Sequence, residues 1–222
     1  MNAIKRLSSA FARRVLGPVR HGTPVAVDVQ TGVHRRNYPS YNAYVQHQSA
    51  KLRREFDVIA EHDKAYEDIV VERYRDQNLA GKTVLCLGAR LGGEVRAFRR
   101  LGALSVGVDL EPGRDNRFVL PGDVHDLQFA DGVFDVCFTN IIDHVLNLEA
   151  FVAETLRVLE PGGLLIAELA HGPIKNYEVN DLSDGRAEAY LRSRLRQIGE
   201  TPIVNKTNYT SWEGVLAVYK RN

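Results

Sequence analysis

The sequence is poor in cysteine, tryptophan and methionine. Its 222 residues include 2 cysteines, 1 tryptophan and 1 methionine. Two cysteines are too few for the disulfide framework of a small secreted domain. Cys86 and Cys137 both fall in apolar runs that predict buried strands, so we interpret them as core thiols in a reducing compartment. We therefore expect a cytoplasmic protein.

Long apolar runs are also missing. No run approaches the roughly 18 residues that a membrane-spanning helix needs. Arg13 and Arg14 interrupt any signal-peptide core near the amino terminus. We expect a soluble protein with no transmembrane segment.

Several catalytic and metal-binding patterns are absent. The sequence contains neither the GxSxG turn of many hydrolases nor the GxxxxGK[ST] loop that binds nucleotide phosphates. No group of cysteines and histidines has the spacing of zinc ligands. These absences disfavour the common hydrolases and phosphate-loop NTPases, and we expect no metal site.

Charge is divided unevenly along the chain. There are ten bases and one acid through Arg54, against 19 bases and 27 acids after it. We assign residues 1–40 to a basic extension that could attract an anionic surface. Residues 1–20 place apolar side chains on one helical stripe, which fits either a membrane-surface or transit-peptide-like helix or a plain terminal helix. Aromatic residues do not interleave with the bases, so nucleic acid is a less favoured partner.

The most informative stretch is KTVLCLGARLGGEVRAF, residues 82–98. An apolar run predicts a strand buried on both faces, three glycines allow a sharp turn, and apolar residues at helical spacing follow. This pattern is typical of the first strand, turn and helix of a doubly wound sheet, which binds ligands beyond the carboxyl ends of its strands.

A second buried strand, LSVGVDLEP, ends near Asp109. Doubly wound folds place a carboxylate there to bind ribose hydroxyls, so the ligand should contain a nucleoside. The dinucleotide fingerprint would need glycine at positions 88, 90 and 93, but Arg90 occupies the middle one. Its side chain would crowd a pyrophosphate, which disfavours NAD.

Five segments occur in order between Thr83 and Leu169: VLCLGARLGG, GVDLEP, GDVHDLQFADGVFD, NIIDHVLNLEAF and RVLEPGGLLIAEL. Together they resemble the motifs of class I S-adenosylmethionine-dependent methyltransferases of the type 11-like group. The resemblance implies a Rossmann-like α/β fold with a seven-stranded, mostly parallel sheet and an antiparallel C-terminal hairpin. It also implies S-adenosyl-L-methionine as the cofactor.

The periodicities and the resemblance together divide the chain into three parts. After the extension, residues 41–78 should form a helical cap and residues 79–222 the methyltransferase domain. Residues 21–40 read as an irregular connection. Ser40 is a plausible N-cap for the first of two cap helices.

Within these parts the sequence predicts the following elements: helices over 41–60, 64–77, 148–159 and 187–198; strands over 118–120, 134–139 and 164–169; and a closing hairpin from 202–210 and 213–220.

The resemblance assigns a set of cofactor-binding positions. Backbone atoms of the glycine turn should meet the cofactor, Asp109 should accept from the ribose hydroxyls, the GDV segment should meet the adenine edge, and the end of the fourth strand should line the donor methyl. Asp123 could instead be a turn-forming aspartate. The assigned residues are Gly88, Ala89, Arg90, Gly92, Asp109, Leu110, Asp123, Val124 and Asn140. On the cap, Tyr41, Tyr44 and Gln48 are candidates to face the cofactor, although Tyr44 and Phe56 could simply be core residues.

Two positions depart from the family pattern. Cys86 replaces the acid that usually opens the first motif, and Arg90 replaces its middle glycine. Arg90 could pair with the cofactor carboxylate, or it could point into solvent over the turn.

The candidate catalytic residues are Asp143, His144 and His171. A histidine near its unperturbed pKa could take a proton from the acceptor. His171 follows the fifth strand, at the edge of the sheet where substrate would lie. His144 matches a histidine that usually packs structurally in the family, and His171 could be an ordinary loop residue. We predict methyl transfer to a small-molecule or glycan-like acceptor. The alternatives are a non-catalytic binding module of the same fold and an NAD-dependent oxidoreductase.

Overall fold

The computed structural model describes residues 23–172, 174, 177–208 and 210–222, and side chains are not described for residues 23–24 and 51–54. The expected terminal helix over 1–20, and most of the basic extension, lie outside this part of the chain. Among the described helices, none is both long enough and apolar enough to cross a membrane.

From residue 23 onward, the connection that we predicted to be irregular has regular structure. It contains an antiparallel hairpin of β1 (Thr23–Val27) and β2 (His34–Asn37). The Asp28 carboxylate accepts from the backbone amides of Gln30 and Thr31, each at 3.0 Å, and so stabilises the turn between the two strands. The expectation of an irregular segment was wrong because this side chain organises the turn.

The two predicted cap helices are present as the two halves of one long element, which a kink divides. Helix α2 (Tyr41–Tyr74) begins at Ser40, whose hydroxyl accepts from the Ala43 amide at 3.2 Å, which confirms the N-cap. The kink lies at Glu55, with φ of −126° and ψ of 25°, rather than near residues 61–63. Phe56, just beyond it, is 51% exposed and is not a core residue. The second half of α2 buries Tyr66, among others, against the sheet.

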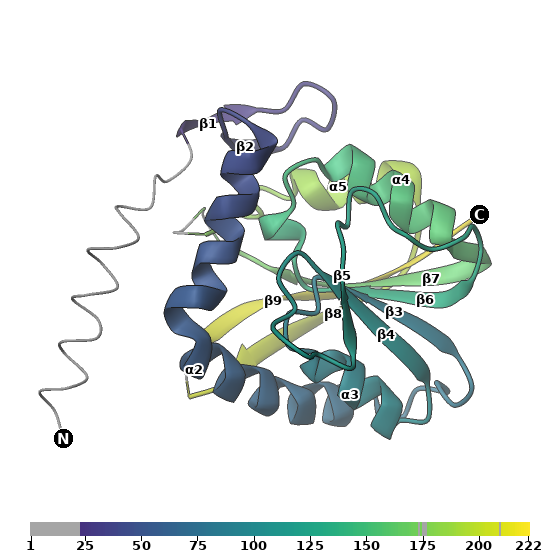
Figure 1. Cartoon of the computed structure of the whole chain (residues 1–222). Coiled ribbons are helices and arrows are strands. Elements are labelled where there is room, and N and C mark those ends of the chain that lie inside the picture. Colours follow the sequence, from purple (N-terminus) through teal and green to yellow (C-terminus); the bar gives the residue numbers. More distant parts are fainter. Residues whose placement is uncertain (1–22, 173, 175–176, 209) are drawn as a thin grey trace, which may run out of the picture.

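The sheet has seven strands in the order β5-β4-β3-β6-β7-β9-β8 (Figure 1). Neighbouring strands from β5 through β7 pair in parallel, and β9 pairs antiparallel with both β7 and β8. This confirms the Rossmann-like expectation. The strands are β3 (Thr83–Leu87), β4 (Leu104–Asp109), β5 (Val119–Pro121), β6 (Phe134–Thr139), β7 (Leu159–Ala170), β8 (Arg196–Lys206) and β9 (Ser211–Lys220).

Helices cover both faces of the sheet (Figure 1). The second half of α2 and α3 (Gly93–Arg100) lie on one face, and α4 (Leu148–Val158) and α5 (Arg186–Arg194) lie on the other. Successive residues of β3 point to opposite faces of the sheet and enter two separate core clusters. Cys86 of β3 belongs to the cluster on the α2 face, and Cys137 of β6 belongs to the cluster on the α4 face. Both thiols are buried and free, which confirms them as core residues.

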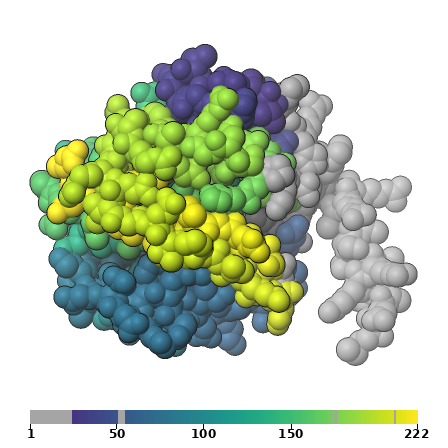
Figure 2. Space-filling model, turned by 180° about the vertical axis from the view of Figure 1, so that it is seen from behind, coloured from purple at the N-terminus to yellow at the C-terminus, as the bar shows by residue number. Residues whose placement is uncertain are grey.

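The end of α5 differs from the prediction. The helix stops at Arg194 instead of continuing to 198, because the chain enters β8 at Arg196. Strands β8 and β9 then form the expected antiparallel hairpin, which crosses the back of the molecule as a yellow-green and yellow band (Figure 2). The hairpin separates α5 from the blue surface of α2 and α3.

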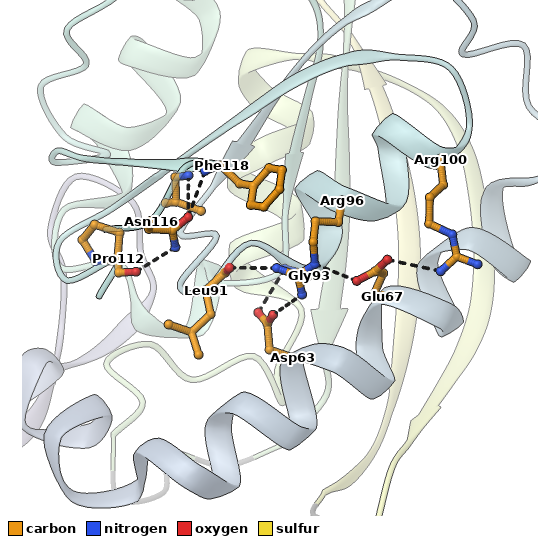
Figure 3. A network of polar contacts seen from close by, with 10 residues as sticks. Asp63, Glu67, Leu91, Gly93, Arg96, Arg100, Pro112, Asn116 and Phe118 are labelled. Carbon is orange, nitrogen blue, oxygen red and sulfur yellow. Dashed lines mark hydrogen bonds and ion pairs between the residues drawn. The ribbon is translucent and has the colours of Figure 1, made fainter. Parts of the chain in front are cut away.

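Helix α2 also holds the glycine turn after β3 (Figure 3). Asp63 accepts from the Gly93 amide at 3.0 Å and from the Arg96 guanidinium at 2.7 Å. Arg96 in turn donates to Glu67 at 2.7 Å and to the Leu91 carbonyl at 3.0 Å. These bonds connect α2, the turn and the first turns of α3.

Glu168 of β7 ties α2 to the other end of the sheet. Its side chain is fully buried and accepts hydrogen bonds from four side chains. The donors are Tyr66 at 2.7 Å, Arg73 at 2.5 Å, Tyr74 at 3.1 Å and Asn205 at 3.1 Å. Because a buried carboxylate is costly unless it is paired, these donors make Glu168 a cross-link between α2, β7 and β8.

We predict that Glu168→Ala lowers the free energy of unfolding by about 3–5 kcal/mol, because it leaves two buried tyrosine hydroxyls and a guanidinium without their acceptor. Urea unfolding followed by circular dichroism measures the change. Glu160→Ala, at the exposed start of the same strand, is the control and should change stability by less than about 0.5 kcal/mol. Equal stability losses in the two variants would contradict the role of Glu168.

The first turn of α3 buries a second acid, Glu94, which is 4% exposed. Burial disfavours its charged form, and the nearby Asp63 and Asp109 carboxylates act in the same direction. Together they raise the pKa of Glu94 to about 8, although its own backbone amide and Arg90 oppose the shift.

This shift predicts a pH-dependent stability. In the unfolded chain the pKa should be near 4.5, so Glu94 binds its proton more tightly in the folded state between pH 4.5 and about 8. Its stabilising contribution is complete below pH 4.5 and is lost as the pH rises through 8. Between pH 5 and 8 the wild type should lose roughly 2–4 kcal/mol more stability than Glu94→Gln. Denaturant unfolding at both pH values tests this, with Glu160→Gln as the control; parallel pH profiles for wild type and Glu94→Gln would contradict it.

Candidate active site

A cavity lies at the carboxyl edge of the sheet, where β3 and β6 meet and the strand order changes direction. It opens to solvent and has walls from α2, the turn after β3, the loop after β4 and the short 3-10 helix η1 (Ile142–His144). We call it the first cavity. Its lining residues are Tyr44, Gln48, Ser49, Ile59, Gly88, Arg90, Asp109, Leu110, Glu111, Val124, Ile141 and His144.

In the turn after β3, the backbone of a glycine forms part of the cavity wall. Gly88 has φ of +75°, and a Cβ at this position would lie 2.5 Å from the Ile141 side chain. The amides of Gly88 and Ala89 donate to the Val108 carbonyl at 2.8 and 3.0 Å, which fixes the turn against β4. Of the predicted turn residues, Gly88 and Arg90 line the cavity, while Ala89 and Gly92 are buried beneath it.

Asp109 ends β4 with its carboxylate at the cavity wall. One oxygen accepts from the Arg90 amide at 2.9 Å and the other from the Glu111 amide at 2.8 Å. Burial raises the pKa of this carboxyl even though both amides favour its charged form. The two amides orient the carboxylate and leave it lone pairs to accept from ligand hydroxyls.

Arg90 occupies the position where the family has a glycine. It adopts the left-handed φ of +45°, is half-buried, and lines the first cavity. Its guanidinium lies close enough to Asp109 and Glu94 to oppose the rise that burial causes in both pKa values. Cys86 cannot supply the missing acid, because burial raises the pKa of its thiol well above the ordinary value. The first motif therefore carries a cation at position 90 and a neutral group at position 86.

The GDV segment is divided between two environments. Val124 lines the cavity, whereas the Asp123 carboxylate accepts from Tyr41 and from both the amide and the ring Nδ1 of His125, the last at 2.6 Å. Partial burial opposes ionisation, but the bonds from His125 and Tyr41 outweigh it and lower the pKa of Asp123 to about 2. The His125 Nε2 accepts from the Asn147 amide at 3.1 Å, so Nδ1 is the protonated nitrogen.

The first half of α2 closes the cavity from above the strand ends. Tyr44 is 3% exposed and donates from its hydroxyl to the His144 carbonyl at 3.2 Å. Gln48 donates to the Tyr177 carbonyl at 2.9 Å. Tyr44 and Gln48 thus form part of the wall, while Tyr41 bonds to Asp123 instead.

A second cavity adjoins the first, and both are lined by Ile59, Arg90, Ile141 and His144. It brings together four predicted residues: Asn140, Asp143 and His144 from the segment after β6, and His171 from the end of β7. The remaining lining residues are Glu55, Val58, His62, Ala170, Gly172, Glu178, Asn180, Thr210, Ser211 and Trp212.

Both ring nitrogens of His144 face groups of the protein. Nδ1 lies 3.0 Å from the Tyr177 carbonyl, so it is the donor there. Nε2 lies 3.6 Å from the Asp143 carboxylate, which is too long for a hydrogen bond. The Asp143 carbonyl meanwhile accepts from the amides of Val179 and Asn180. These contacts hold η1 against the segment before α5.

Several lining residues were not foreseen. Ile141 could have been inferred, because it directly follows Asn140 at the end of β6. Trp212, Glu178 and the residues near the α2 kink carry no sequence signal, because the fold alone brings them to the cavity. No group of three or more potential metal ligands occurs among the residues that the structure describes.

Residues 85–167 match the methyltransferase domain family. The chain is 34% identical over 107 residues to a demethylmenaquinone methyltransferase of Tropheryma whipplei, a match that covers 41% of this chain and 44% of that protein. It is 31% identical over 121 residues to an uncharacterized methyltransferase of Mycobacterium marinum, covering 47% and 46%. The matched part thus spans about half the length of these curated relatives.

Solved structures resemble the fold over a longer stretch. A 1,6-didemethyltoxoflavin-N1-methyltransferase of Burkholderia thailandensis, crystallised with S-adenosylhomocysteine, has a TM-score of 0.66 at 15% identity and covers 90% of this chain and 100% of that one. A putative methyltransferase in complex with the Haloferax volcanii Trm112 activator has a TM-score of 0.58 at 21% identity, covering 77% and 97%. The domain match therefore places residues 85–167 in the methyltransferase domain family, and the sheet around them has the strand order expected of a class I S-adenosylmethionine-dependent methyltransferase.

Proposed function

We propose that the protein binds S-adenosylmethionine in the first cavity and transfers its methyl group to an acceptor in the second. The observation that carries this proposal is that the two cavities adjoin at the carboxyl edge of the sheet, with Asp109 in the wall of the first and Asn140 in the wall of the second. A cofactor spanning the shared wall would present its methyl to the second cavity.

The residues of the first cavity fit such a cofactor. Gly88 allows close approach of its backbone, and the oriented carboxylate of Asp109 is suited to a ribose diol. Val124 offers an apolar edge for adenine, whereas Asp123 is already engaged by Tyr41 and His125. The sulfonium supplies an activated methyl group, so the protein has mainly to align donor and acceptor and to exclude water.

Arg90 is assigned to the amino-acid end of the cofactor. It lines both cavities and is half-buried, and a guanidinium can bind a carboxylate through two parallel hydrogen bonds. In this assignment Arg90 compensates for the missing acid at Cys86 by anchoring the carboxylate of the cofactor rather than its amino group.

The acceptor is proposed to be a small organic molecule. The second cavity mixes polar groups such as Asn140 and His171 with the aromatic surface of Trp212, and is suited to a compact ligand with polar substituents. The names of the two characterised relatives, which refer to demethylmenaquinone and 1,6-didemethyltoxoflavin, fit this class. A glycan-like acceptor and recruitment to an anionic surface by the basic extension stay secondary hypotheses.

Calorimetric titration with S-adenosylhomocysteine tests the cofactor site. We expect micromolar binding, about −8 kcal/mol, and at least a roughly tenfold loss in Asp109→Ala. Asp76→Ala, which removes an exposed carboxylate after α2, is the matched control and should bind like wild type. Binding of NAD instead would favour the oxidoreductase, and binding of neither ligand would favour the non-catalytic module.

The role of Arg90 has a separate test. Arg90→Ala should weaken S-adenosylhomocysteine about tenfold, through loss of a charge-assisted pair. It should leave the affinity for 5′-methylthioadenosine unchanged, since that ligand lacks the amino-acid carboxylate. Equal weakening of both ligands would mean that the substitution disturbs the turn, and no weakening of either would refute the assignment.

A further inference from the structure

His171 lies between the second cavity and a separate hollow. It follows the end of β7, and its amide donates to the Glu213 carbonyl at 3.0 Å, which fixes its backbone beside β9. Its side chain is half exposed and lines both spaces. The hollow is open to solvent, and its other lining residues are Gly172, Leu182, Ser183, Gly185, Glu188, Arg192, Glu200 and Val215.

Glu188 meets His171 from the side of this hollow. It lies in the first turn of α5, is 5% exposed, and places one carboxylate oxygen 3.2 Å from the His171 Nε2. Its other oxygen, Oε2, is buried and has no hydrogen-bond partner among the described residues. A buried acid that is only half satisfied is costly, so its contact with the imidazole requires an explanation.

The contact selects one form of the imidazole. A carboxylate only accepts hydrogen bonds, so the Nε2 of neutral His171 must carry the proton. Nδ1 then holds the free lone pair, and no described residue bonds to it. His144 in the same cavity differs, because its Nδ1 donates to a carbonyl and its Nε2 faces Asp143.

We propose that Glu188 is a positioning residue that holds His171 with Nδ1 ready to take a proton from the methyl acceptor. This inference rests on the proposed function and narrows the acceptor to one whose nucleophilic oxygen or nitrogen carries a hydrogen. The acceptor lone pair forms the bond to the methyl carbon, and the electron pair of the carbon–sulfur bond stays on sulfur. The acceptor proton passes to Nδ1, and the imidazolium releases its Nε2 proton through Glu188 toward the open hollow.

Other charged or titratable groups surround the pair and do not bond to His171. They are Arg192 on α5, Glu200 on β8, Tyr219 on β9, and Asp143, His144 and Glu178 in the second cavity. The Glu200 carboxylate accepts instead from the side-chain amide of Gln197 at 2.6 Å. It therefore offers a matched control, a carboxylate in the same hollow without the imidazole contact.

Nitrogen NMR of the full chain, labelled with ¹⁵N-histidine, reads the tautomer directly. The His171 signals are assigned by their loss in His171→Gln. At pH 8 we expect wild-type His171 to be protonated at Nε2 and bare at Nδ1. Glu188→Ala should lose this preference, Glu188→Gln should retain it because the amide oxygen still accepts, and Glu200→Ala should match wild type.

Two results would overturn the inference: a wild-type His171 protonated at Nδ1, or the same tautomer in Glu188→Ala as in wild type. Calorimetry with S-adenosylhomocysteine on the same samples separates this outcome from failure of the proposed function. Glu188 lies outside the first cavity, so Glu188→Ala should bind this ligand like wild type. If the wild type does not bind S-adenosylhomocysteine, the proposed function is refuted, whichever nitrogen of His171 carries the proton.

Discussion

The site depends on one hydrogen bond between elements that are 30 residues apart, from the Gly93 amide to the Asp63 carboxylate. The residue before α3, Gly92, has no side chain to cap the helix, so α2 supplies the cap from outside. The approach is close enough that a Cβ on Gly93 would lie 2.3 Å from the Asp63 carbonyl oxygen. We call this contact between Asp63 and Gly93 the clamp. Arg96 pairs with the largely buried Asp63 carboxylate, so the clamp leaves no unpaired buried charge.

This clamp explains how the turn accommodates an arginine where the family has glycine. A left-handed conformation costs a non-glycine residue about 1 kcal/mol. Here the Arg90 amide bonds to Asp109, and the turn is fixed at both ends, by β4 behind Gly88 and by α2 behind Gly93. The departure from the family pattern therefore adds a positive charge at the cavity in a turn whose backbone is fixed at both ends.

Much of the fold was readable from the sequence, because strands buried on both faces have continuous apolar runs. The bounds of β6, and the end of β4 at Asp109, match the prediction residue for residue. The kink at Glu55 could not be foreseen, since no proline or glycine marks it. Asp63, Glu168 and Glu188 were missed for a related reason: their main partners lie 17 to 102 residues away in the chain, so only the fold reveals the contacts that they make.

The two cavities differ in how far their residues could be predicted from the sequence. The first includes the turns at the ends of β3 and β4, where geometry restricts the choice of residue, as the Ile141 contact restricts Gly88. The second is built from side chains on α2, η1, β7 and the loop before β9, and the fold imposes no residue type at these positions. Motifs can therefore identify the cofactor of such a protein, while the chemistry of its acceptor has to be inferred from contacts such as that between His171 and Glu188.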